Sequence, residues 1–171
     1  MGLDAYAYTL NRDIAESYDY KQRAACEPHK WARRAVGFVE LSAAEVDKLT
    51  PEDRARYRTA AEQALDKAKE MSLFDSGFAY WRKFNHLHGW MERLYQERGG
   101  TDDFNCIAIW LDEESIDRLE REAADLKPTE GFFFGVYEPM DDDDKAEIAS
   151  FIAECREAFA AGDAVFYDSW Y

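Results

Sequence analysis

The sequence predicts an α+β fold in which a small, largely antiparallel sheet of about four or five strands has helices packed on one side. Short segments that alternate apolar and polar residues stand between longer segments with helical periodicity. The short segments lack the long, continuously apolar character of strands in a buried parallel sheet. Hydrophobic residues make up 47% and aromatic residues 15% of the 171 residues, which favours a packed core over a disordered chain. We expect residues 1–171 to form a single domain.

The first part of the chain predicts one strand followed by helices. Residues 3–10 alternate and are rich in β-forming side chains, so they predict a strand. Residues 42–45 (SAAE) have the spacing of a capping box and predict a short helix. The Thr-Pro pair at 50–51 predicts the start of a helix of about 20 residues. We therefore interpret residues 12–73 as a helical insertion in the sheet-bearing core.

The second part of the chain alternates predicted helices and strands. An apolar stripe with helical spacing predicts a helix over residues 81–98, which the glycine pair at 99–100 closes. Residues 112–127 and 141–161 each begin with an acidic capping residue and predict two further helices. The strands predicted between these helices lie within residues 74–80, 104–110, 131–136 and 164–167.

The net charge is concentrated in one part of the chain. The sequence carries 36 acidic and 21 basic residues, a net charge of −15 with neutral histidines. Residues 1–100 have equal numbers of both signs, so residues 101–171 carry the whole imbalance. Nucleic-acid phosphates would be repelled there, so we expect no direct binding of a nucleic-acid backbone by this acidic part. Its acidic helix exteriors are instead a candidate face for a basic partner.

Four consecutive carboxylates are the strongest acidic feature of this part. Capping and the helix dipole favour one or two acids at a helix N-terminus, and four exceed that need. The run lacks the spacing of a calcium-binding loop, so we expect no metal site there. The candidate partner-binding residues are the members of this run, Asp141, Asp142, Asp143 and Asp144.

The densest group of functional side chains lies in residues 80–90. On a helix His86 and His88 would point about 160° apart, so they would not share a metal ion. His88 falls inside the apolar face, where a histidine is either a structural core residue or a ligand contact and general base in a cleft. Lys83 or Arg82 would supply positive charge beside it. An obvious nucleophile is missing, so the catalytic residues are unknown, with His88 and Lys83 as the candidates.

Four motifs follow one another along the chain: MGLDxYxY at the start, YWRKxNxxHxW from Tyr80, GFFFG from Gly131, and DSW ending at Trp170. With these motifs the chain resembles a family of small tailed-phage and prophage proteins, over the first ten residues and roughly 76–171. The long 12–73 segment, and Asp168 in place of the more usual Ser, depart from the family's commoner pattern. The resemblance implies a phage origin and no established activity. It groups into one candidate surface the residues Arg82, Lys83, Asn85, His88, Gly131, Gly135, Ser169 and Trp170.

Two functions from different classes stay open at this point. The first is a non-enzymatic phage or prophage accessory protein that binds a host macromolecule, in its sharper form as an acidic inhibitor of a defence or nucleic-acid enzyme. The second is a small-molecule-binding protein or enzyme with a cleft around His88, Lys83 and the predicted strand at 131–135. We favour the first and lean against an enzyme. The ligand-binding residues of the second would be Arg82, Asn85, His88, Trp90, Gly131, Gly135, Ser169 and Trp170.

Further expectations concern cofactors, compartment and assembly. The GFFFG motif lacks the spacing of a phosphate-binding loop, and we expect neither a cofactor nor a metal. The apolar runs fall far short of the about 20 residues that span a membrane. Three cysteines without a paired spacing indicate free thiols in a reducing cytoplasm, that of the host for a phage protein, and Cys106 and Cys155 are expected to be buried. Apolar patches for a homo-oligomer could come from Trp31, Trp90 and Trp110.

Overall fold

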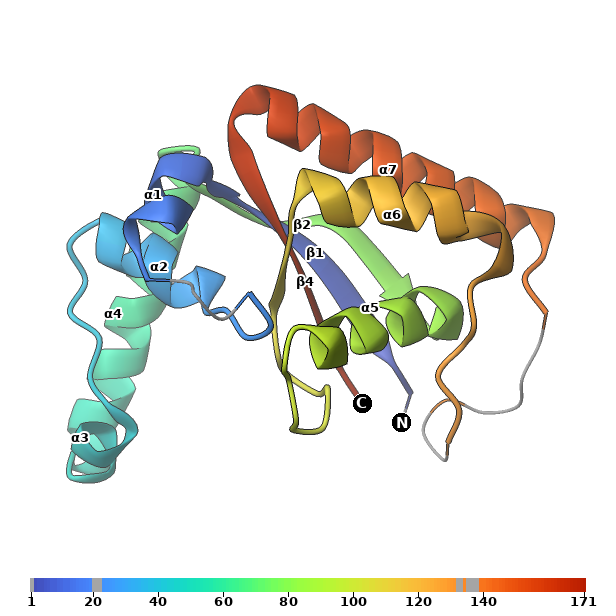
Figure 1. The fold of residues 1–171 in the computed structure, drawn as a ribbon. Helices are drawn as coiled ribbons and strands as arrows, with labels where there is room; N and C mark the ends of the chain where they lie inside the picture. The colour runs from blue at the N-terminus through green and yellow to red at the C-terminus, as the bar shows by residue number, and fades with distance from the viewer. Residues whose placement is uncertain (1, 20–22, 132–133, 135–138) are drawn as a thin grey trace.

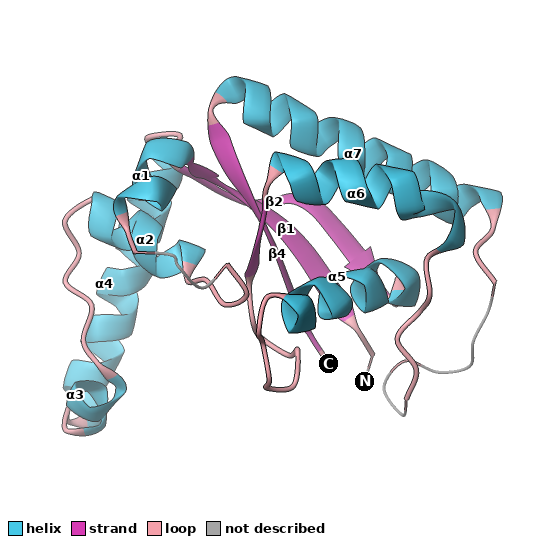
Figure 2. Ribbon diagram, in the orientation of Figure 1, coloured by secondary structure: helices cyan, strands magenta, loops and turns pink. Residues whose placement is uncertain are grey.

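The computed structural model describes residues 2–19, 23–131, 134 and 139–171, and Figure 1 shows their arrangement. Helices account for most of the elements, and the strands run through the middle of the molecule (Figure 2). In chain order the elements are β1 (Asp4–Asn11), α1 (Arg12–Ser17), α2 (Pro28–Ala35), α3 (Ala43–Asp47), α4 (Pro51–Glu70), β2 (Phe74–Arg82), α5 (Asn85–Glu97), β3 (Ile109–Leu111), α6 (Glu113–Glu122), a 3-10 turn (Ala123–Asp125), α7 (Asp142–Ala161) and β4 (Asp163–Trp170).

The strands of the described residues form one antiparallel sheet in the order β2-β1-β4-β3. β1 is a central strand, and its residue Asp4 lies opposite Arg82 of β2 and Trp170 of β4. The pairing of β1 with β2 shifts register between Ala7 and Thr9, which marks a bulge in β2. The predicted α+β fold with a small antiparallel sheet is confirmed.

The inner face of the sheet carries the larger core. Because side chains alternate along a strand, Ala5 and Ala7 of β1 point to the same face as Trp81, Val165 and Tyr167 on the neighbouring strands. These residues form one buried cluster with apolar side chains of α5, α6 and α7. Figure 1 shows the three helices together on this side of the sheet.

The opposite face is covered at one end by the helices that precede β2. Leu10, Phe74 and Phe166 point to this face and form a second buried cluster with Trp31 of α2 and Ala68 of α4. In Figure 1, α1 to α4 stand together at this end of the sheet. The other end of the same face is more open. The exposed fractions are 53% for Tyr80 and 52% for Trp170, its most exposed large side chains.

Local capping accounts for the helix ends. Ser42 and Glu45 form the predicted capping box, and the Thr50 side chain accepts a hydrogen bond from the Asp53 backbone N–H at the start of α4. α7 ends at Gly162, whose φ of 88° lies in the left-handed region that glycine adopts without strain. No helix of the described part of the chain is long and apolar enough to cross a membrane.

The helix predicted over residues 81–98 begins later, at Asn85. β2 continues to Arg82, because Trp81 pairs with Ala5 and fills the inner core. The chain then turns at Lys83, whose φ is 61°. The prediction failed because Trp81 fits both the helical period and the strand alternation, and only pairing with β1 decides between them.

Two predicted strands also differ. Only the last residues of the segment 104–110 pair, because Cys106 has a φ of 58°, which breaks the extended chain. Cys106 is therefore exposed rather than buried, whereas Cys155 is buried as predicted. In the segment 131–136, the Phe134 N–H bonds the Gly131 carbonyl in a turn. Its other residues from 132 to 136 lie outside the described part of the chain.

Candidate functional site

His88 is a core residue of α5. Its side chain has no solvent exposure, and its Nδ1 lies 3.1 Å from the hydroxyl of Tyr167 on β4. Burial lowers the pKa of His88 to about 4, so the imidazole is neutral near pH 7. Burial also raises the pKa of Tyr167, and the charge of Asp168 adds to that effect. The pair is thus a neutral hydrogen bond inside the core.

Aromatic rings enclose the His88 imidazole. Phe104 and Phe134 stack on it with centroids 5.3 Å and 5.4 Å away, and Tyr171 meets it edge-on at 5.7 Å. The Nε2 atom has no hydrogen-bond partner among the residues that the structure describes. This closed packing fits the structural role that the sequence left open for His88.

Other residues predicted to join His88 point to separate neighbours. The Asn85 side chain donates to the Phe134 carbonyl at 2.6 Å and so holds the turn after Gly131 against α5. Trp90 is buried, and its indole N–H donates to Glu122 of α6 at 2.8 Å. Ser169 is buried opposite Ala5, on the inner face. Gly135 lies outside the described residues.

The basic residues and Trp170 lie elsewhere. Arg82 and Trp170 flank Asp4 in one row across three strands, on the outer face of the sheet. Trp170 therefore faces away from its neighbour Ser169, because successive strand residues point to opposite faces. Lys83 is exposed at the end of β2. The structure thus divides the predicted candidate surface into a buried centre and an exposed sheet face.

The four-aspartate run has local roles at the start of α7. Asp141 and Asp144 form a capping box, each side chain accepting from the other's backbone N–H. Asp142 pairs with Lys145 at 3.3 Å. Asp143 is exposed and forms no ion pair within the described part of the chain. Three of the four acids therefore contribute to the helix itself.

Asp143 instead begins an acidic stripe along α7. It is followed on the same helix face by Glu147, Glu154 and Glu157, at spacings of four, seven and three residues, with Ser150 between them. We call Asp143, Glu147, Glu154 and Glu157 the α7 acidic stripe. Among the described residues none of the four forms an ion pair, and burial together with Asp144 raises the pKa of Glu147.

The acids of α6, in contrast, are partly neutralised. Arg156 lies on the other side of α7 and pairs with Asp117 at 3.2 Å and with Glu120 at 2.6 Å. Arg118 pairs with Glu122 of its own helix at 2.8 Å and also with a glutamate of α5. The i, i+4, i+11, i+14 spacing of the stripe is visible in the sequence, but which acids form ion pairs within the described residues is a property of the packing.

A groove of about 190 Å³ separates the α7 acidic stripe from β2. Its floor is apolar, because Phe151 of α7 packs against Phe78 and Trp81 with ring centroids 6.0 Å and 4.8 Å away. Its α7 wall is polar. The residues that line the groove are Phe78, Ala79, Tyr80, Trp81, Glu147, Ser150, Phe151 and Glu154.

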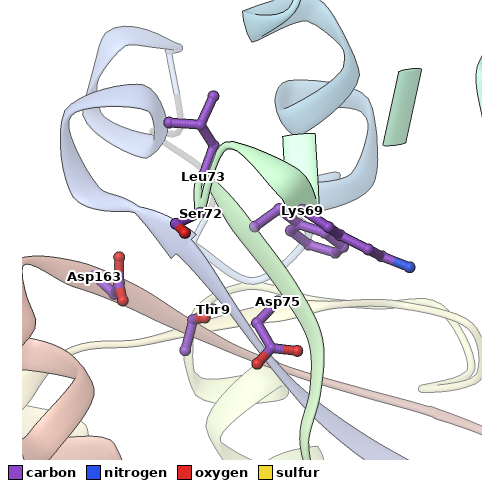
Figure 3. Close-up of a pocket in the computed structure, with 7 residues that line it drawn as sticks. Thr9, Lys69, Ser72, Leu73, Asp75 and Asp163 are labelled. Carbon is purple, nitrogen blue, oxygen red and sulfur yellow. The ribbon is translucent and has the colours of Figure 1, made fainter. Parts of the chain in front are cut away.

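A second hollow of about 400 Å³ lies where α4 meets the sheet. In Figure 3 the carboxylates of Asp75 and Asp163 lie on either side of Thr9, and the Lys69 amino group points away from them. Burial and the charge of Asp75 raise the pKa of Asp163. Its lining contains neither histidine nor cysteine, being Thr9, Lys69, Ser72, Leu73, Phe74, Asp75 and Asp163.

Comparisons with known proteins assign no function to the chain. No protein-family model matches the chain, and neither a curated protein nor a solved structure matches it significantly. Within the described residues there is also no group of three or more histidine, cysteine, aspartate or glutamate side chains placed to hold a metal ion. The α7 acidic stripe, which forms no ion pair among the described residues, gives the groove beside it a negatively charged wall.

Proposed function

We propose that the chain is a phage-type accessory protein that binds a basic surface of a host protein through the α7 acidic stripe. The observation that supports this most is the absence of ion pairs at all four stripe carboxylates in the described part of the chain. Elsewhere on α6 and α7, arginines of the same chain form ion pairs with several acidic residues. The stripe therefore keeps its charge available for an external partner.

The scaffold under the stripe suits recognition. α7 is a 20-residue helix fixed at its N-terminus by a capping box and anchored to the sheet by the buried side chains of Ile148, Phe151, Ile152 and Cys155. Its carboxylates are thus held in a row before a partner arrives, which lowers the entropy cost of binding. A row of like charges also accelerates association with an oppositely charged surface, in a salt-dependent way. Basic grooves of defence or nucleic-acid enzymes are the class of partner that this charge favours.

Capture from a host lysate tests the proposal with two charge-matched variants. In the stripe variant Asp143→Asn, Glu147→Gln, Glu154→Gln and Glu157→Gln remove the four charges. The control variant removes four exposed charges from α1 and α4, through Asp13→Asn, Glu16→Gln, Glu62→Gln and Glu70→Gln. Both variants change the net charge equally. Bound proteins are identified by mass spectrometry after nuclease treatment.

We expect the wild type and the control variant to retain the same partner, and the stripe variant to lose it. Raising the salt from about 0.05 M to about 0.5 M should weaken the capture, because the Debye length falls well below 10 Å. Equal capture by the stripe variant, or capture that is insensitive to salt, would overturn the proposal. Loss of the partner after nuclease treatment would mean that nucleic acid bridged the two proteins, and would also overturn it.

A further inference from the structure

The two edges of the sheet differ in how they are covered. On the β3 side, the Cys26 N–H bonds the Ala108 carbonyl at 2.7 Å and the Trp110 N–H bonds the Arg23 carbonyl at 3.2 Å. The segment around residues 23–26 therefore protects that edge. β2 forms the other edge and pairs only with β1 among the described residues. An edge strand with free N–H and C=O groups is a template for another strand.

The register identifies the outward groups of β2. The Lys83 N–H bonds the Leu3 carbonyl at 2.8 Å, which makes this a hydrogen-bonded pair of the β1–β2 ladder. In an antiparallel ladder such pairs alternate with pairs whose backbone groups point away from each other. The backbone N–H and C=O groups of Tyr80 and Arg82 consequently point outward, and the described residues provide them with no backbone partner.

The groove between β2 and α7 runs along this open edge. Phe78, Ala79, Tyr80 and Trp81 line it from the strand side, and Glu147 and Glu154 line it from the helix side. These two carboxylates are stripe residues without ion pairs in the described chain. A hydrogen-bonding edge, an apolar floor and a negatively charged wall therefore meet at one place.

We infer that an extended, basic segment of the partner protein adds to the sheet as a new strand beside β2. This inference rests on the proposed function and identifies the part of the partner that is bound. The backbone of the segment pairs with the outward groups of Tyr80 and Arg82, as in other complexes formed by strand addition. Lysine or arginine side chains at alternate positions face Glu147 and Glu154.

The dimensions fit such a segment. Glu147 and Glu154 are seven residues apart on α7, which corresponds to about 10 Å along the helix. Alternate side chains of a strand are about 7 Å apart, so two or three basic residues on one face span both carboxylates. The residues that lie between them point to the other face of the sheet, where Tyr80 is exposed, and small apolar side chains such as valine fit there.

Synthetic peptides test strand addition directly. The first peptide has eight residues that alternate lysine and valine, with blocked ends. The second is identical but carries N-methyl groups on the alternate backbone nitrogens that would face β2, and the third has glutamate in place of lysine. Affinity is measured by calorimetry with the full chain. We expect the first peptide to bind at least about tenfold more tightly than the second, because two or more hydrogen bonds are lost. The third should not bind.

Two further measurements locate the bound peptide. Hydrogen exchange should slow at the Tyr80 and Arg82 amides when the lysine peptide is present. Tyr80→Pro removes one outward N–H and should weaken the peptide at least about fivefold relative to Tyr80→Ala, which removes the same side chain but keeps that N–H. The melting temperatures of both variants show whether they fold.

The outcomes separate this inference from the proposed function. Equal binding of the first two peptides, or unchanged exchange at β2, would overturn strand addition while stripe-dependent capture from the lysate could still stand. Failure of that capture would instead overturn the proposed function. Amides of β2 that are already protected in the protein alone, together with a dimeric mass, would mean that a second copy occupies the edge, and would also overturn the inference.

Discussion

Acidification should destabilise the fold through His88. In the folded state burial holds its pKa near 4, against an ordinary value of 6.5 in the unfolded chain. Between these values only the unfolded state takes up the proton. The free energy of unfolding that the neutral His88 imidazole contributes is therefore fully present above pH 6.5, and it is lost as the pH falls toward 4. At pH 5 this loss amounts to about 2 kcal/mol relative to pH 7.

Urea unfolding at pH 7 and pH 5, followed by tryptophan fluorescence, measures this loss. His88→Phe removes the titrating group, and it lowers the stability at both pH values because the Tyr167 hydroxyl loses its partner. Between pH 7 and pH 5 the free energy of unfolding of His88→Phe should fall by about 2 kcal/mol less than that of the wild type. His29→Phe serves as a comparison, because burial also lowers the pKa of His29 to about 4, at a site between Tyr8 and Phe74. The same pH dependence in the wild type and His88→Phe would refute the reasoning.

Three other substitutions test the packing. Tyr167→Phe leaves the His88 Nδ1 unpaired in the core and should cost about 1–3 kcal/mol in urea unfolding. The double variant with His88→Phe should recover part of that cost, so strict additivity would contradict the pairing. Gly89→Ala places a Cβ 2.6 Å from the backbone of the segment after α6 and should lower the melting temperature by several degrees, whereas Gly77→Ala meets open space and should change it little. Arg98→Leu removes one of the two guanidinium partners of Asp112, which caps α6 and keeps Arg23, and also the hydrogen bond to Ser115. It should cost about 1–2 kcal/mol in urea unfolding, and an unchanged stability would be the contrary result.

Helix boundaries were predictable because their determinants are local. The Thr50 side chain accepts a hydrogen bond from a backbone N–H three residues away. Gly162 adopts the left-handed conformation that ends its own helix without strain. The boundary between β2 and α5 was not predictable from local signals. Trp81 belongs to the strand because it pairs with Ala5, which lies far away in the sequence. Local preference cannot report a contact of that sequence separation.

The candidate site was predictable only in part. The spacing of Asp143, Glu147, Glu154 and Glu157 is a pattern of the sequence, and the acidic helix exteriors were expected as a partner face. That they form no ion pair with other described residues depends on Arg156 facing α6 instead, which only the packing decides. The open edge likewise depends on the strand order, because β2 would be an internal strand if another strand followed it in the sheet.

The strand order also has a consequence for folding kinetics. β1 is synthesised first but is a central strand, and it must wait for β4 before its second ladder can form, as the Asp4 and Trp170 pair illustrates. Until then β1 and β2 can form only a two-stranded ribbon, which is marginally stable in water. Contacts between such distant residues slow the folding of a domain. We therefore expect the sheet to close only once β4 has been synthesised, with the second edge of β1 unpaired until then.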